Sequence, residues 1–198
     1  MGYFSVNMFT FYLVRHGETE HNKLQIAMGQ HNSSLSSKGR QDAQIIGELL
    51  RNITFTAIFT SDLGRAIETA RIVRKNLNEK CKTESRKELR EINYGIYNNT
   101  PKATFETRCK AYKNKDVAFV FPDGESLLDV KKRAGEFIIS LEEKYENQII
   151  LIVTHSGTIR GIVSYFTERY LEKVSRRELN HKYVGKFEIS NGKLKKYE

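Results

Sequence analysis

Short apolar runs alternate along this chain with segments whose apolar residues recur at helical spacing. The apolar runs predict strands at 9–14 (FTFYLV), 56–61 (TAIFTS) and 148–154 (QIILIVT), and a weaker run predicts a strand at 82–86. Helical spacing predicts helices over 36–52, 63–77 and 125–145, and a further helix from about residue 157. Strands that alternate with helices in this way indicate an α/β fold with a largely parallel sheet, covered on both faces.

Two of the predicted helices have recognisable beginnings. Ser36 is a candidate N-cap for the helix over 36–52, and Ser61 or Asp62 for the helix over 63–77, because short polar side chains accept hydrogen bonds from the first backbone amides of a helix. The apolar residues expected on the buried faces are Ala43, Ile46, Leu49 and Leu50 in the first helix and Ala66, Ala70, Val73 and Leu77 in the second.

The end of the chain and one internal segment complete the organisation. Asn191-Gly192 separates the runs KYVGKFEIS and KLKKYE, which is typical of a β-hairpin. Pro101 and Pro122 bracket a segment, about 101–121, that forms either a connecting loop or a short lid. We expect residues 1–198 to form a single domain, because a chain of 198 residues with 39% hydrophobic content can bury one ample core.

Composition limits the location and the partners of the protein. The chain has no run of about 18 apolar residues, and its start lacks the features of a signal peptide. We therefore expect a cytoplasmic protein without a membrane partner, with Cys81 and Cys109 as reduced thiols. The formal net charge is +9, but residues 169–198 alone carry nine Lys or Arg against four Glu. Because this basic tail lacks aromatic platforms and any nucleic-acid motif, we predict no nucleic-acid partner.

Polar side chains follow every predicted parallel strand. They are Arg15 and His16 after the first strand, Arg65 in the helical turn after the second, Glu91 after the third and His155 after the fourth. The carboxyl ends of parallel strands meet at one edge of a sheet, where the following helices also point their amino ends. Two arginines and two histidines at one edge predict a site for a phosphoryl group, which is doubly charged and rich in acceptor oxygens.

Each of these residues also has a purely structural explanation. A histidine at a strand end is often only hydrogen-bonded, and Arg65 could pair with Glu68 at i+3. The coincidence of all these positions at one edge favours a site instead.

Metal binding is the other common use of histidine. His16, His21 and His31 lie near Glu18 and Glu20 in sequence, but no pair has the i, i+4 histidine spacing of a zincin. An arginine beside the site would also oppose cation binding. We therefore expect neither a metal nor any other cofactor.

Five motifs together resemble a known family. LVRHGETEHN (13–22) is similar to the signature of the histidine phosphatase superfamily, the phosphoglycerate mutase-like enzymes. The other motifs of the pattern follow in order, as TSDLGRAIETA (60–70), LREINYG (89–95), FPDGES (121–126) and IVTHSGTIR (152–160). The resemblance covers residues 9–166 and implies a three-layer α/β/α sandwich with a mainly parallel central sheet.

The resemblance also implies residue roles. It identifies His16 as the nucleophile and Glu91 as the proton donor. It implies that Arg15, Arg65 and His155 hold the phosphoryl group, and Asn22 matches a family position that also contacts phosphate. The sequence departs from the pattern at Ser156, where a glycine is common, at Tyr97, where a tryptophan is common, and at His21, where an aromatic residue is usual.

The chemistry of these residue types is consistent with such roles. His16 must be neutral to attack phosphorus, and we expect its other ring nitrogen to donate to a backbone carbonyl. Gly17 would let the backbone approach the phosphate closely. Arg15, Arg65 and a protonated His155 would neutralise the equatorial oxygens of the transition state.

The predicted function is metal-independent hydrolysis of small phosphate monoesters, with a phosphorylated metabolite as substrate and a phosphohistidine intermediate on His16. Two alternatives remain, a phosphoglycerate mutase-type transfer and a non-catalytic phosphate- or protein-binding module. A binding module has no use for both a nucleophile and an acid. Only 64 positions separate Glu91 from His155, which leaves little chain for the long cover of the mutases that the sequence resembles.

Overall fold

A six-stranded sheet forms the centre of the computed structural model, which describes residues 7–78, 81–109, 116–167 and 179–198. Its strands are β1 (Phe9–Arg15), β3 (Ala57–Ser61), β4 (Lys82–Arg86), β6 (Ile149–Thr154), β7 (Val184–Ser190) and β8 (Lys193–Tyr197). They lie in the order β4-β3-β6-β1-β7-β8, in which the first four are parallel and β7 runs antiparallel to both of its neighbours. The predicted strands and the mainly parallel sheet are confirmed.

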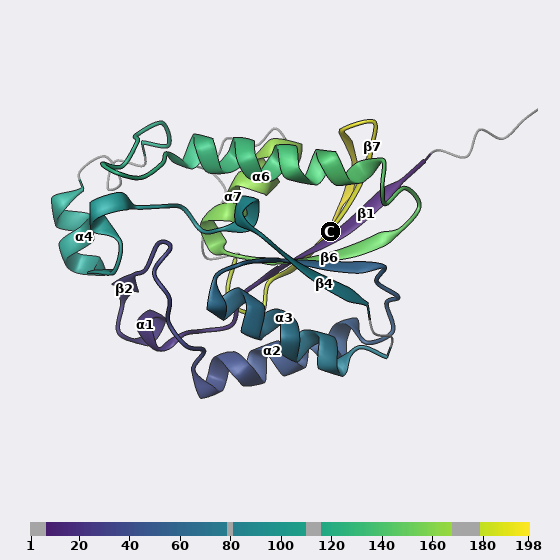
Figure 1. Cartoon of the computed structure of the whole chain (residues 1–198), viewed down its shortest axis with the longest axis horizontal. Helices are drawn as coiled ribbons and strands as arrows, with labels where there is room; N and C mark the ends of the chain where they lie inside the picture. The colour runs from purple at the N-terminus through teal and green to yellow at the C-terminus, as the bar shows by residue number, and fades with distance from the viewer. Residues whose placement is uncertain (1–6, 79–80, 110–115, 168–178) are drawn as a thin grey trace, which may run out of the picture.

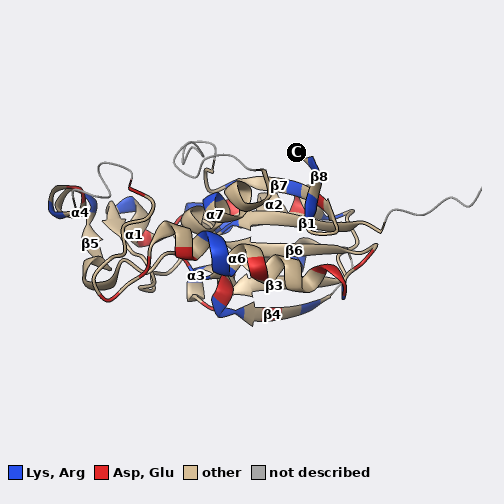
Figure 2. Cartoon of the chain, turned by 90° about the horizontal axis from the view of Figure 1, so that it is seen from above, with Lys and Arg blue, Asp and Glu red and all other residues tan. Residues whose placement is uncertain are grey.

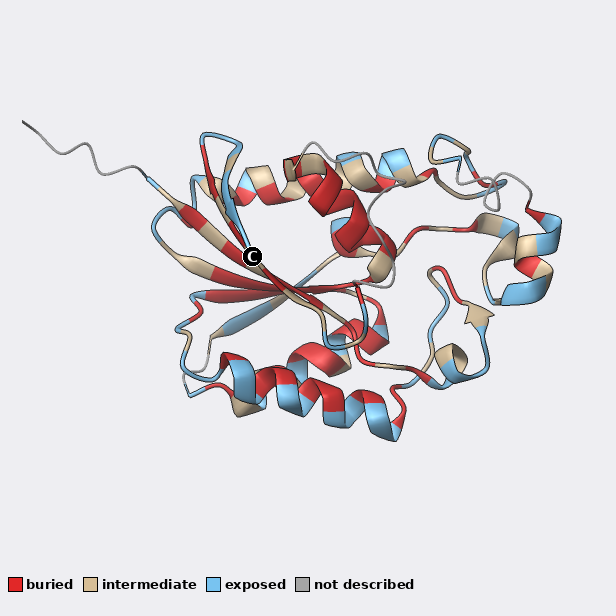
Figure 3. Cartoon of the chain, turned by 180° about the vertical axis from the view of Figure 1, so that it is seen from behind, coloured by how far each residue is buried: buried red, intermediate tan, exposed pale blue. Residues whose placement is uncertain are grey.

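Helices cover both faces of this sheet (Figure 1). One face carries α2 (Ser37–Leu50) and α3 (Gly64–Asn76), and the other carries α6 (Leu127–Glu142) and α7 (Ser156–Thr167). Two apolar clusters fill the spaces between sheet and helices, and Figure 3 shows the buried residues concentrated in the strands and on the inward sides of the helices. The predicted three-layer α/β/α sandwich is confirmed.

The helix beginnings only partly follow the predictions. The Ser36 hydroxyl caps α2 by accepting from the Gly39 amide, as expected. At α3 the predicted cap is wrong, because Leu63 occupies the N-cap position without a side-chain hydrogen bond. The Asp62 carboxylate instead accepts two hydrogen bonds of 2.6 Å from Arg90. A charge-assisted bidentate pair is stronger than a cap, so tertiary structure overrides the local signal.

The prediction that Leu49 lies on the buried face of α2 is also wrong. Ala43, Ile46 and Leu50 are buried against the sheet, but Leu49 is 68% exposed. In a helix, neighbouring residues point about 100° apart, so Leu49 and Leu50 cannot both face the sheet squarely.

The C-terminal hairpin forms as predicted. β7 and β8 are joined at Asn191 and Gly192, whose φ angles of 52° and 70° are those of a tight turn with two left-handed residues. The lysines of β8 lie at the edge of the sheet, and Figure 2 shows basic and acidic residues distributed over many elements of the fold.

A group of small elements lies beyond the ends of the main strands (Figures 1 and 2). It comprises α1 (Glu20–Lys23), the two-stranded sheet of β2 (Ile26–Ala27) and β5 (Thr100–Pro101), and α4 (Lys102–Arg108), and two short 3₁₀ helices lie at Lys87–Leu89 and Gly95–Tyr97. The start of the predicted loop or lid over 101–121 thus forms a strand end and a helix, whereas residues 110–115 lie outside the described part. Within the described ranges, no helix is long and apolar enough to cross a bilayer.

Candidate active site

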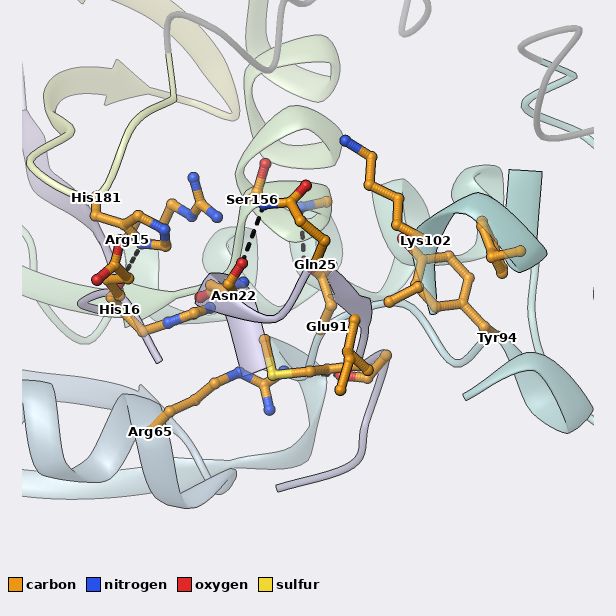
Figure 4. Close-up of a pocket in the computed structure, with 17 residues that line it drawn as sticks. Arg15, His16, Asn22, Gln25, Arg65, Glu91, Tyr94, Lys102, Ser156 and His181 are labelled. Carbon is orange, nitrogen blue, oxygen red and sulfur yellow. Dashed lines mark hydrogen bonds between the residues drawn. The ribbon is translucent and has the colours of Figure 1, made fainter. Parts of the chain in front are cut away.

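The carboxyl ends of the parallel strands meet at one edge of the sheet. Arg15 at the end of β1 pairs in register with Thr154 at the end of β6, and Thr60 of β3 pairs with Val153. A cavity of about 340 Å³ lies at this edge (Figure 4). The topology therefore delivers the residues that follow each strand to one place, as the sequence analysis expected.

The cavity brings together most of the predicted site residues. Its walls include Arg15, His16, Asn22, Arg65 and Glu91. His155 is fully buried next to them, with its ring centroid 5.0 Å from that of His16. The wall residues that the sequence analysis did not place at the site include Glu18, Gln25, Met28, Tyr94, Lys102, Phe105 and His181.

His16 is held in one orientation by its own loop. It follows β1 directly, its amide donates to the Thr154 carbonyl, and only 3% of the residue is exposed. Its Nδ1 lies 2.8 Å from the Gly17 carbonyl oxygen. Because a carbonyl can only accept, Nδ1 carries the proton and Nε2 has a free lone pair. Burial, followed by the charges of Arg65 and Arg15, holds the pKa of His16 well below its ordinary value, so the ring is neutral and nucleophilic at neutral pH.

Arg65 is a buried cation fixed on three sides. It lies in the first turn of α3 and is only 1% exposed. Its Nη1 and Nη2 donate to the carbonyls of His31 and Gly29, both at 2.7 Å, and its Nε donates to Nδ1 of His155 at 3.2 Å. Burial lowers the pKa of Arg65 to about 10, and the group stays charged at neutral pH. The alternative pairing with Glu68 does not form, since Glu68 binds Arg40.

The structure corrects the expected protonation state of His155. Because Arg65 donates to Nδ1, that nitrogen has no proton, and the neutral ring carries its proton on Nε2. Burial and the charge of Arg65 hold the pKa of His155 well below its ordinary value. Within the described residues Nε2 has no hydrogen-bond partner although it is buried. A buried donor without a partner is costly, so Nε2–H is suited to an anionic ligand.

Glu91 faces this group from the segment after β4. Its Oε1 accepts from the Ile92 amide at 2.9 Å and its Oε2 from the Gly157 amide at 3.1 Å. A Cβ at Gly157 would lie 2.2 Å from Glu91 Oε1. The absence of a side chain at Gly157 therefore allows the carboxylate to lie against the start of α7.

Residues missed by the sequence analysis hold the Glu91 segment in place. Arg133 of α6 donates to the carbonyls of Glu88 and Arg90, at 2.6 and 2.8 Å, while also contacting the Glu125 carboxylate. Thr158 of α7 donates to the Arg90 carbonyl at 2.7 Å. In the sequence Arg133 looks like any polar position of an amphipathic helix, so only its tertiary contacts identify it.

Asn22 is positioned by a short capping motif. Its Oδ1 accepts from the amide and the hydroxyl of Thr19, the N-cap residue of α1. These bonds occupy the acceptor of the amide group, which leaves Nδ2 as the donor for a ligand in the cavity.

The structure gives a packing reason for the glycine at position 17. A Cβ there would lie 2.4 Å from the Gly39 carbonyl oxygen, and a Cβ at Gly39 would lie 2.0 Å from the Glu18 carbonyl oxygen. The loop after β1 therefore packs directly on the backbone of α2. This close packing requires a glycine at position 17, and the approach of its backbone to phosphate stays a prediction.

The far part of the cavity belongs to the small elements. Ile26 and Ala27 of β2 and Lys102 and Phe105 of α4 line it together with Tyr94. Phe105 packs against Tyr94 with a ring-centroid distance of 4.8 Å. These residues give the cavity an apolar wall with one ammonium group. In the described ranges, no group of three or more His, Cys, Asp or Glu side chains is arranged to hold a metal ion.

Comparison with known proteins identifies the family. Residues 11–196 match the family profile of the histidine phosphatase superfamily (branch 1). The chain belongs to the histidine phosphatase superfamily. It is therefore an enzyme of that class, and the resemblance found in its motifs is confirmed.

Several members of the superfamily resemble this chain along much of its length. The probable phosphoglycerate mutase GpmB of Proteus mirabilis is 30% identical over 173 residues, which are 82% of this chain and 80% of that protein. The fructose-2,6-bisphosphatase TIGAR of Xenopus tropicalis is 35% identical over 132 residues, covering 65% of this chain and 48% of that protein. The structure of YhfR from Bacillus stearothermophilus superimposes with a TM-score of 0.83 at 31% identity, covering 94% of both chains.

Two of the departures from the superfamily pattern, Ser156 and Tyr97, lie at different places. Ser156, the first residue of α7, lines the cavity, whereas Tyr97 packs on Phe105 and Phe121 in the small apolar cluster beside it. Ser156 therefore adds a hydroxyl to the site, whereas Tyr97 packs against α4 beside the cavity.

Proposed function

We propose that this histidine phosphatase hydrolyses small phosphate monoesters through a phosphohistidine on Nε2 of His16, without a metal. The single observation that carries the proposal is the neutral, buried His16, whose Nε2 lone pair is free beside two guanidinium groups. In phosphoryl transfer the protein mainly positions the reactants and neutralises charge, and this arrangement supplies both.

In the first step, His16 Nε2 attacks phosphorus, the P–N bond forms and the bond to the leaving oxygen breaks. Arg15 and Arg65 balance the charge of the phosphoryl oxygens, and Asn22 Nδ2 and His155 Nε2–H donate to them. Held donors of this kind stabilise the transition state without reorganisation, and the loss of one such donor commonly costs 10²- to 10³-fold in rate.

Glu91 acts as the general acid and then as the general base. It gives its proton to the leaving alkoxide in the first step, and in the second it takes a proton from the water that attacks phospho-His16. The attack releases inorganic phosphate and restores Nε2. General acid–base catalysis of this kind contributes roughly 10²- to 10⁴-fold. The hydrogen bonds from the amides of Ile92 and Gly157 fix the position of both carboxylate oxygens for these proton transfers.

The names of the relatives leave both hydrolysis and mutase transfer as candidates, since GpmB is named a probable mutase and TIGAR a bisphosphatase. The elements that the chain forms between Glu91 and His155 favour hydrolysis. Of its described elements, α6 and β6 belong to the main sandwich, which leaves the 3₁₀ turn, β5 and the seven-residue α4 near the cavity. A mutase must shield its phosphohistidine from water, and these elements offer little cover.

The test is a panel of phosphorylated metabolites assayed for released phosphate and for isomerised product. We expect phosphate release from sugar phosphates, phosphoglycerates or an aryl phosphate. We expect His16→Ala to abolish release, while acid-labile, alkali-stable phosphate appears on the wild-type protein after rapid quench. His21→Gln is the matched control, because His21 does not line the cavity. Interconversion of 3- and 2-phosphoglycerate faster than phosphate release would establish the mutase alternative, and an active His16→Ala enzyme would refute the nucleophile.

A further inference from the structure

A third histidine lies at the phosphoryl end of the cavity. His181 precedes β7 and lines the cavity, and its ring centroid is 5.7 Å from that of His16 (Figure 4). Its Nδ1 lies 3.0 Å from the His16 carbonyl oxygen. Two residues earlier, the Leu179 carbonyl accepts from Arg15 Nη1 at 2.6 Å. One short segment therefore contacts both Arg15 and His16, although it is more than 160 residues away in sequence.

The hydrogen bond to His16 defines which nitrogen of His181 is available. The carbonyl can only accept, so Nδ1 carries a proton and Nε2 of the neutral ring has a lone pair. Among the described residues, no hydrogen-bond partner of Nε2 is found, and this nitrogen is not sealed from solvent as that of His155 is. The hydrogen bond that holds the backbone of His16 uses only Nδ1 of His181. The second nitrogen is thus left for whatever fills the cavity.

Charged groups from several elements surround this ring. Arg15 and His16 face it from the end of β1, Glu18 from the following loop, and Asp42 from α2. Burial, followed by the charge of Arg15, lowers the pKa of His181 to about 4, while Glu18 and Asp42 act in the opposite direction. The ring is therefore neutral at neutral pH. A bound dianion would favour its protonated form, because an opposite charge at hydrogen-bond distance raises the pKa of an imidazole.

We propose that His181 is a third histidine of the phosphoryl site, which takes up a proton as a tetrahedral dianion binds and donates from Nε2 to it. This inference rests on the proposed function, in so far as the cavity must accept a phosphoryl group. It assigns two tasks to one ring, since Nδ1–H orients the nucleophile loop and Nε2–H binds the anion. Proton uptake and binding are then linked, so His181 strengthens anion binding as the pH falls from neutral.

Two substitutions separate the tasks. His181→Asn can keep a donor to the His16 carbonyl, because the Asn amide nitrogen lies at a similar distance from Cβ as Nδ1, but it has nothing in place of Nε2. His181→Ala removes both. Inorganic sulfate is the probe, since it stays a dianion where histidines titrate, and its affinity is measured by calorimetry at about pH 6 and about pH 8. We expect both variants to bind sulfate roughly tenfold more weakly than wild type at the lower pH, with a smaller difference at the higher pH.

Calorimetry in buffers of different ionisation enthalpy measures the protons taken up on binding. We expect wild type to take up protons when sulfate binds, and His181→Asn to take up fewer. Lys182→Arg is the matched control, because it alters the same segment but keeps the positive charge beside Asp42, and the Lys182 side chain, 55% exposed, lies outside the cavity wall. It should retain wild-type proton uptake.

The outcomes are distinguishable. If His181→Ala is impaired and His181→Asn is not, His181 only braces the loop and the proposal is wrong. Equal affinity and equal proton uptake in wild type and both variants would also overturn it, while leaving the proposed function intact. A wild-type protein that binds no sulfate, phosphate or vanadate would overturn both.

Discussion

Gly157→Ala should displace the carboxylate of Glu91, the proposed general acid, from its position in the site. The added Cβ would lie 2.2 Å from Glu91 Oε1 and 3.1 Å from its Cδ, whereas ordinary contacts of a Cβ begin near 3.4 Å. The carboxylate must therefore move by roughly 1 Å, and a misplacement of this size can cost on the order of 10²-fold in rate. That factor corresponds to about 2.7 kcal/mol of transition-state stabilisation. Complete loss of the acid would cost up to about 10⁴-fold.

The fold should tolerate this substitution. Gly157 lies in the first turn of α7 without a positive φ, and alanine has a higher helix propensity than glycine by about 1 kcal/mol. The matched control is Gly64→Ala at the start of α3, next to Arg65, where an added Cβ meets only the Asn32 side chain at 3.6 Å. We expect this control to keep wild-type rates.

The assay compares two classes of substrate. An alkyl phosphate needs a proton on its leaving oxygen, so its kcat should fall by about 10² or more in Gly157→Ala. A nitrophenyl phosphate does not need that proton, so its phosphohistidine should form readily and then hydrolyse slowly, which gives a burst of nitrophenolate. The reasoning is refuted if kcat for both substrates stays within about threefold of wild type, or roughly 0.6 kcal/mol.

Three further predictions concern the charges of the site. Arg65→Lys should lower kcat/KM by about 10²-fold or more, because an ammonium group cannot reproduce the three hydrogen bonds that the Arg65 guanidinium donates. Arg40→Lys is the control and should change kcat/KM little, because Arg40 forms an exposed ion pair with Glu68. The pKa values of His16 and His155 are lowered in the folded protein, so as the pH falls the unfolded chain takes up protons on these histidines before the folded protein does. The free energy of unfolding should therefore fall as the pH drops below about 6.5, by up to about 1.4 kcal/mol per pH unit for each histidine. Urea unfolding at several pH values checks this, and a slope unchanged in His16→Asn would contradict it. Chelators should leave the rate unchanged and vanadate should inhibit strongly, because the guanidinium groups of Arg15 and Arg65 line the proposed phosphoryl site. Activity lost in EDTA and restored by Mg²⁺ or Zn²⁺ would refute metal independence.

Local patterns in the sequence determined the layered fold. Buried strands and amphipathic helices have distinct hydrophobic periods, and the Ser36 cap and the Asn191-Gly192 turn depend on a few consecutive residues. The parallel order then brings the residues after each strand to one edge, which is why Arg15, His16, Arg65 and Glu91 could be predicted together.

Only the tertiary structure decided how those residues are held and which protons they carry. The tautomer of His155 depends on a hydrogen bond from Arg65, 90 positions away, and the place of His181 depends on a bond across 165 positions. The roles of Gly17 and Arg133 likewise depend on backbone groups distant in sequence. Periodicity reveals which face of an element is buried, but hydrogen-bond partners and desolvation are set by contacts between elements, and these fix the protonation states on which the proposed chemistry depends.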